Sequence, residues 1–96
     1  MTFNAHSVTE KDDVASVVCD IAPGETVTMQ RRSGTLALTA VTAIPAGHKI
    51  ALRDFRAGES VIKYGEVIGA ASEDISKGAH VHVHNLEGLR GRGDKR

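Results

Sequence analysis

Short runs of alternating apolar and polar residues occupy most of the 96-residue chain. Alternation with period 2 is typical of β-strands that bury one face. Gly, Pro, Asp and Ser mark the turns between the runs. The pattern predicts a first short strand within residues 3–8 and further strands at 26–29, 36–41, 48–52, 60–63, 67–71 and 80–84.

One segment has a helical period instead. Its apolar residues recur at i, i+3, i+4 and i+7, namely Val14, Val17, Val18 and Ile21. The preceding segment resembles a helix start, with Thr9 as the cap and Asp12 reaching back to it. We therefore expect one short helix, which needs packing because Val is an indifferent helix former. Cys19 falls beside the apolar stripe, and we interpret it as a half-buried apolar residue rather than a catalytic thiol.

A turn motif occurs four times from residue 21 onward. Each copy has an apolar residue, two variable residues and a Gly, and a strand-like run follows. The copies are Ile21-Ala22-Pro23-Gly24, Ile44-Pro45-Ala46-Gly47, Phe55-Arg56-Ala57-Gly58 and Ile75-Ser76-Lys77-Gly78. Gly can take a positive φ in a tight turn, and the apolar residue can pack beneath it. Uneven spacing excludes a solenoid, so we predict one mainly β domain with one short helix, barrel-like or clip-like in architecture.

Composition excludes several functional classes. The net charge is zero and the only aromatic residues are two Phe and one Tyr, which disfavours nucleic-acid binding. No apolar run approaches the roughly 20 residues of a membrane-spanning helix, and the N-terminus lacks a secretory pattern. A single cysteine excludes an internal disulfide, which suits a reducing compartment. We expect a cytoplasmic protein that binds neither nucleic acid nor a membrane.

Two charged segments are predicted to lie outside the core. Arg31-Arg32-Ser33-Gly34 has the composition of a hairpin tip, with two solvated arginines. Residues 86–96 are rich in Gly and Arg and cannot bury a core of their own. We expect residues 1–85 to form the domain and residues 86–96 a flexible tail or linker, whose removal leaves the thermal stability nearly unchanged.

Three histidines alternate along the last predicted strand. His80, His82 and His84 would share one face of an extended strand, and the two intervening valines the other. Imidazole transfers protons near neutral pH and is a common metal ligand. Three such rings span about 13 Å, so at most two can bind one ion, and a third ligand must come from elsewhere, such as His48 or a partner chain. A solvated polar face is the simpler alternative.

Other polar residues have both a functional and a simpler interpretation. Lys49 or Lys63 could hold a substrate carboxylate as a point charge, and Lys63 with Tyr64 could equally be an ordinary strand edge. His48 follows a turn and could merely cap it. His6 is most simply a surface residue.

Three motifs resemble the altronate dehydratase family of sugar-acid lyases, specifically their small subunit or N-terminal domain. They are Gly47-His48-Lys49, Val61-Ile62-Lys63-Tyr64-Gly65 and Gly78-Ala79-His80-Val81-His82-Val83-His84-Asn85. The resemblance implies a β-clip fold of the SAF type. It also implies that a large lyase subunit, absent from this chain, carries most of the active site. The tail is similar to the linker that leads into the large domain of fused members.

The resemblance implies a small subunit that completes the active site of an altronate- or galactarate-type dehydratase, or of a sulfolactate sulfo-lyase. These are β-eliminations from a small hydroxy acid, and we expect the chain to be inactive without its large subunit. A divalent metal, iron or manganese rather than zinc, would be held mainly by the partner. The site prediction is catalysis by His48 and His82, substrate binding by Lys49, Lys63 and Asn85, and metal binding by His80 and His84.

Two alternatives remain open from the sequence. The domain could be a non-catalytic substrate-binding or assembly module of the large subunit, or a free-standing metal-binding protein. The sequence also leaves formation of a homo-oligomer open.

Overall fold

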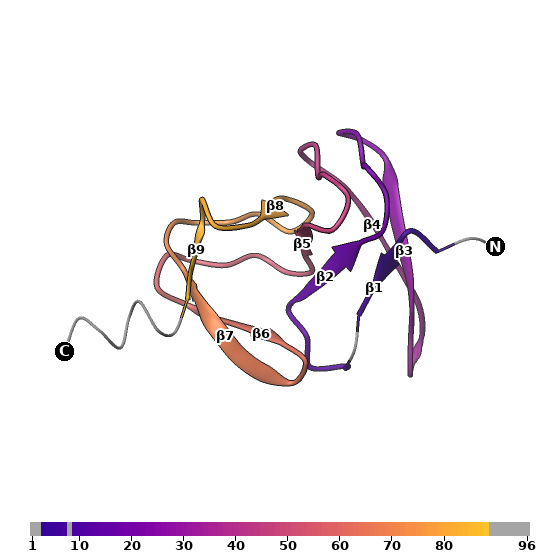
Figure 1. The fold of residues 1–96 in the computed structure, drawn as a ribbon. Coiled ribbons are helices and arrows are strands. Elements are labelled where there is room, and N and C mark those ends of the chain that lie inside the picture. The colour runs from indigo at the N-terminus through magenta and orange to yellow at the C-terminus, as the bar shows by residue number, and fades with distance from the viewer. Residues whose placement is uncertain (1–2, 8, 89–96) are drawn as a thin grey trace.

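The computed structural model describes residues 3–7 and 9–88, and over these ranges it contains strands but no helix (Figure 1). The strands form three antiparallel sheets. The first has the order β1 (Ala5–His6), β2 (Val14–Val17), β5 (Lys49–Ala51), β8 (His80–Val81); the second pairs β3 (Thr26–Arg31) with β4 (Gly34–Thr39); the third has the order β6 (Ser60–Lys63), β7 (Glu66–Ala71), β9 (Leu86–Gly88). This all-strand domain confirms the mainly β class and is consistent with an SAF-like β-clip. No helix in the described part of the chain is available to cross a membrane.

The first sheet separates two apolar clusters, and this arrangement explains why the helix prediction was wrong. Ala15 and Ile50 pack into one cluster, whereas Val14 and Ala51 pack into the other. A strand buried on both faces contains a continuous apolar run, which periodicity alone does not distinguish from a buried helix. The run ends at Val17, because Val18 is exposed.

The predicted helix start is a turn that leads into β2. Asp12 does reach back to Thr9, since Thr9 donates its N–H and its hydroxyl to the Asp12 carboxylate, at 3.2 and 2.8 Å. The residue expected beside the helical stripe, Cys19, is exposed rather than half-buried, so that prediction was also wrong.

All four turn motifs fold as predicted. Each motif Gly has a positive φ, between 85° and 92°, and each apolar residue is buried. The turns associate in pairs, through bridges between Ile21 and Ile44 and between Phe55 and Ile75. The pairing arranges the domain as two turn pairs, one on each side of the first sheet.

An acidic residue that precedes the motif caps the opposite turn in three of the four cases. These carboxylates accept the bonds Ala46 N–H to Asp20 (2.9 Å), Ala57 N–H to Asp74 (2.9 Å) and Lys77 N–H to Asp54 (2.7 Å). In the fourth case the capping position holds Ala43, and the position that it faces holds Pro23, which has no N–H to donate. The motif that lacks a preceding acidic residue therefore faces the motif whose third residue has no N–H to donate.

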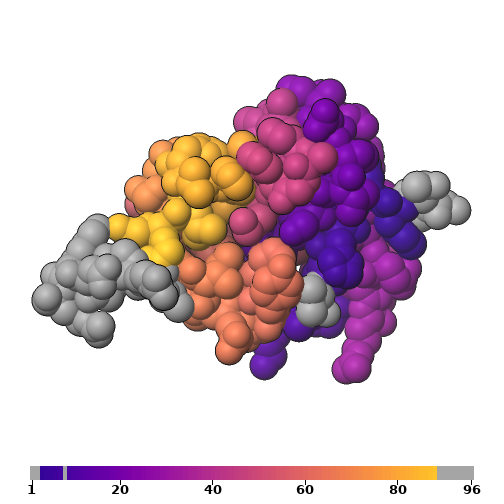
Figure 2. Space-filling model, in the orientation of Figure 1, coloured from indigo at the N-terminus to yellow at the C-terminus, as the bar shows by residue number. Residues whose placement is uncertain are grey.

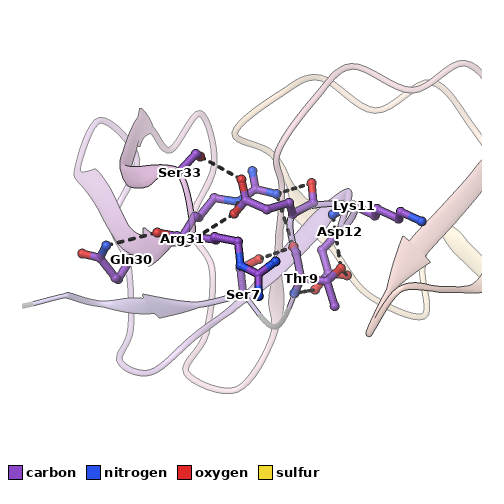
Figure 3. Close-up of polar contacts among 9 residues, drawn as sticks. Ser7, Thr9, Lys11, Asp12, Gln30, Arg31 and Ser33 are labelled. Carbon is purple, nitrogen blue, oxygen red and sulfur yellow. Dashed lines mark hydrogen bonds and ion pairs between the residues drawn. The ribbon is translucent and has the colours of Figure 1, made fainter.

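The hairpin tip was located correctly, but one of its arginines is not solvated. Arg31 donates to the backbone oxygen of Glu10 at 2.6 Å, and the Glu10 carboxylate accepts the N–H of Arg32 and the hydroxyl of Ser33 (Figure 3). The β3–β4 ribbon follows one side of the molecule, and its tip projects from the body in the space-filling view (Figure 2).

The first residues of the predicted tail belong to the third sheet. β9 pairs with β7, with Leu86 opposite Ala71 and Gly88 opposite Gly69. A Cβ added at Gly69 would lie 2.2 Å from the backbone oxygen of Glu87, so this Gly is required by the close approach of the two strands. The boundary predicted at residue 85 thus falls before a paired strand, and residues 89–96 lie outside the described part.

Truncation after Asn85 should destabilise the domain, contrary to the expectation from the sequence. Loss of three paired residues, at about 1 kcal/mol per backbone hydrogen bond, amounts to roughly 2–3 kcal/mol, or a Tm lower by about 10 °C for a domain of this size. Thermal unfolding followed by circular dichroism measures this change in Tm, with truncation after Leu89 as the control. Equal Tm values for the two truncations would show that β9 contributes nothing.

Candidate functional site

Three imidazoles from two of the sequence motifs meet at one end of the first sheet. His48 immediately precedes β5, and His80 begins β8, which pairs with β5. The His48 Nδ1 and His80 Nε2 atoms lie 2.8 Å apart, which is a hydrogen bond. The ring of His82 stacks on that of His48 at a centroid distance of 3.7 Å. One ring nitrogen from each of the three lies within 4.8 Å of the others, so they form a single cluster.

His82 enters this cluster because the predicted strand 80–84 ends at Val81. Asn85 is buried, and its side chain accepts the N–H of His82 at 3.0 Å and donates to the oxygen of His80 at 2.9 Å. Such side-chain bonds to the backbone compete with a strand ladder, and here they fold residues 82–85 into a turn. The prediction of five extended residues was therefore wrong, and Val83 is 82% exposed rather than buried.

The same turn places the other two predicted site residues of this segment, His84 and Asn85, in different surroundings. His84 is exposed and outside the three-histidine cluster, although its ring lies 4.9 Å from that of His80. Asn85 has both ends of its amide bonded to the backbone, so its visible role is to hold the turn. Metal binding by His84 and substrate binding by Asn85 stay predictions.

His48 does not cap its own turn, because Ala46 of that turn already donates its N–H to Asp20 and the first turn position has no N–H. In two other copies of the turn motif a Glu follows the Gly, and its carboxylate accepts an N–H from the start of the same turn, as Glu25 does from Ala22 and Glu59 from Arg56. In the copy that contains His48, the corresponding position is Pro45, which lacks an N–H. The His48 ring is therefore available to bond to His80.

The charge state of the cluster follows from burial and neighbouring cations. Partial burial, reinforced by the charges of His84 and His48, lowers the pKa of His80. Partial burial and the charges of His48 and Lys49 lower the pKa of His82. Both rings are thus neutral at neutral pH, the form that accepts a proton or binds a metal.

One lysine, Lys49, follows His48 directly in the chain, and its charge contributes to the lowered pKa of His80 and of His82. Burial and the charge of Lys63 lower the pKa of Lys49. Lys63 is only 6% exposed, and its Nζ lies 3.5 Å from the centroid of the Tyr64 ring. A pocket of about 340 Å³ lies beside the cluster and is lined in part by Thr42, His80 and His84. A larger pocket, of about 530 Å³ between the residue 7–11 segment and the β3–β4 hairpin, contains none of the predicted site residues.

The three clustered rings fit a divalent metal. His82 Nδ1 is buried without a hydrogen-bond partner among the described residues, so one lone pair or proton there is unused. Ligand nitrogens about 2.1 Å from a tetrahedral ion lie roughly 3.4 Å apart, which small ring rotations would reach from the separations in the cluster. The set that the structure brings together is His48, His80 and His82, rather than the predicted pair His80 and His84.

Comparison with known proteins gives the same family as the sequence motifs. Residues 4–89 match the altronate/galactarate dehydratase SAF domain. An altronate dehydratase of Escherichia coli is 43% identical over 77% of this chain, which spans 14% of that protein. The (2R)-sulfolactate sulfo-lyase subunit alpha of Chromohalobacter salexigens is 39% identical over 86% of this chain and 93% of its own length. The subunit alpha of Paracoccus pantotrophus is 51% identical over 55% of this chain. The chain belongs to the SAF domain family of altronate and galactarate dehydratases.

Proposed function

We propose that this chain is the small subunit of a hydroxy-acid lyase and completes the active site of a separate large subunit. The observation that carries the proposal is the cluster of His48, His80 and His82, with Lys49 next to His48 in the chain. The similarity to a sulfolactate sulfo-lyase subunit alpha over 93% of that subunit's length supports a small-subunit role.

The reaction that suits these groups is a β-elimination from a 2-hydroxy acid. An imidazole of the cluster, His82 or His48, removes the proton beside the carboxylate and becomes an imidazolium. The electrons of that C–H bond form the new C=C bond, and the bond to the leaving group breaks with its electron pair. Hydroxide leaves as water with the proton that the imidazolium returns, whereas a sulfonate substrate releases sulfite. The ammonium groups of Lys49 and Lys63 hold the substrate carboxylate and oppose the charge that develops on the enediolate.

A metal would compete with this use of the same rings. A divalent ion bound by His48, His80 and His82 would supply Lewis-acid stabilisation of the enediolate. A ring that binds the ion cannot also take the substrate proton. We propose that any such ion is held mainly by the partner subunit, as the family resemblance implies.

Metal titration of the full chain alone distinguishes these uses. If the partner holds the metal, isothermal calorimetry with Mn²⁺, Fe²⁺ or Zn²⁺ should give a Kd weaker than about 10 μM, or less than roughly 7 kcal/mol of binding free energy. Tighter binding that is lost in His48→Ala and His80→Ala would instead show that this chain carries its own metal site. His6→Ala, at an exposed position on β1, is the control.

Reconstitution tests the proposal as a whole. The chain is co-expressed with a candidate large lyase subunit, and the complex is assayed with altronate, galactarate and sulfolactate. We expect neither subunit alone to turn over a substrate that the complex consumes. Full activity of the large subunit alone would refute a shared active site.

A non-catalytic role is the second candidate, favoured by the exposed position of the pocket beside His84. In that role the domain covers the partner's site and binds the distal end of the substrate. Kinetics of the reconstituted complex separate the two, because loss of a binding contact raises KM while kcat stays constant.

A further inference from the structure

The turn between β6 and β7 contains an unfavourable backbone conformation. Tyr64 and Gly65 both have positive φ, at 58° and 75°. This is the pattern of a type I′ turn, in which Asn-Gly is the usual pair. Gly adopts it freely, but Tyr does so rarely, and it persists only where the surroundings enforce it. Among the described residues, Tyr64 is the one non-glycine residue in this region of φ.

Asp12 supplies the restraint. Its carboxylate is buried and accepts the N–H of Gly65 at 3.0 Å. The same carboxylate accepts two bonds from Thr9, which fix its orientation (Figure 3). Thr9 also packs on the turn, because a Cβ on Gly65 would lie 3.6 Å from its methyl group. The segment that the sequence suggested as a helix start thus holds the β6–β7 turn.

The consequence of this restraint is the position of one ring. The Lys63 ammonium lies 3.5 Å from the centre of the Tyr64 ring, a favourable cation–π contact. Asn in place of Tyr64 would relieve the strain of the backbone conformation. It would also remove the aromatic ring that contacts the buried Lys63. The chain therefore retains an unfavourable residue in the turn whose ring contacts a lysine of the candidate site.

We propose that Tyr64 is a positioning residue for Lys63, and that Asp12 acts through it by holding the left-handed turn that places the ring against the ammonium group. The inference rests on the proposed function for the role of Lys63 in substrate binding. The contact itself is a property of this chain alone.

Nuclear magnetic resonance of the full chain tests the contact without any assay of activity. Ring current should shift the Lys63 ε-methylene protons upfield in the wild type and in Tyr64→Phe. The shift should disappear in Tyr64→Asn and shrink in Asp12→Ala. Tyr64→Asn should unfold at a Tm close to that of the wild type, because Asn tolerates this φ but the favourable cation–π contact is lost. An unshifted methylene in the wild type, or an undiminished shift in Asp12→Ala, would overturn the proposal.

Kinetics of the reconstituted complex test the consequence. We expect Tyr64→Asn to raise KM about tenfold with little change in kcat, and Tyr64→Phe to restore most of the affinity. Asp12→Ala should raise KM in the wild-type background but add little to Tyr64→Asn, since both act through one ring. Glu25→Ala loses a similar carboxylate–backbone bond, to the N–H of Ala22, outside the β6–β7 hairpin and both pockets, and is the control. Additive effects, or an equal effect of Glu25→Ala, would refute positioning. An inactive complex with the ring-current shift intact would refute the proposed function and leave the contact standing.

Discussion

Gly78→Ala should be among the most destabilising single substitutions in this domain. The φ of Gly78 is +88°, where an L-residue costs roughly 1–2 kcal/mol. An added Cβ would also lie 2.3 Å from the backbone oxygen of Thr39, and relief of such overpacking costs a further 1–3 kcal/mol or so. A total of about 3 kcal/mol should lower Tm by about 10–20 °C, measured by thermal unfolding.

Gly24→Ala is the matched control for this prediction. Gly24 occupies the same position of the turn motif with almost the same φ, +87°, but a Cβ there would meet nothing within 4 Å. It should therefore show only the backbone cost, about 1–2 kcal/mol. If the two variants unfold at the same temperature, then Thr39 yields freely and the close approach contributes little to stability.

The turn motifs explain how far the fold could be predicted from the sequence. The roles of the Gly and the apolar residue could be predicted from each copy of the motif alone, because both follow local rules of turn conformation. The caps required a comparison between copies: Asp20, Asp54 and Asp74 each precede a motif but cap a different one. The pairing of the turns is a tertiary property. The coincidence of Ala43 with Pro23 was the one signal in the sequence that could have indicated which turns pair.

The two wrong secondary-structure assignments share a physical cause. The helix predicted from a start at Thr9 to Ile21 and the strand predicted at 80–84 were both assigned from local patterns. In the first, burial of β2 between two apolar clusters produced a run with an apparent helical period. In the second, the buried side chain of Asn85 replaced ladder bonds with a turn. Each competing interaction involves burial, which periodicity does not report.

The sequence named the candidate residues, but not which of them lie together. It predicted a metal pair of His80 and His84, with a third ligand from outside the strand, such as His48 or a partner chain. The structure brings His48, His80 and His82 together and leaves His84 outside. The contribution of Asp12 was missed, because Thr9 and Asp12 were interpreted as a helix cap and nothing local connects them to Gly65.

His82→Ala in the reconstituted complex should cause the largest loss of activity. Its neutral ring, stacked on His48, is placed to exchange a proton with the substrate, and removal of a general acid or base typically costs about 10²- to 10⁴-fold in rate. If the ring transfers the proton, the loss falls on kcat and KM changes little. Steady-state kinetics with the best substrate among altronate, galactarate and sulfolactate measure both constants. His48→Ala should behave similarly, because it removes the stacked partner of His82 and the hydrogen bond to His80.

The matched control is His6→Ala, since His6 is exposed on β1, outside the histidine cluster. We expect its kinetic constants to equal those of the wild type. Co-purification of each variant with the large subunit must be shown first, because a lost complex would mimic lost catalysis. A rise in KM at constant kcat for His82→Ala would assign the cluster to substrate binding, and the domain would then be a recognition module. An unchanged kcat/KM would remove His82 from the reaction, because neither proton transfer nor transition-state binding by His82 is compatible with that result.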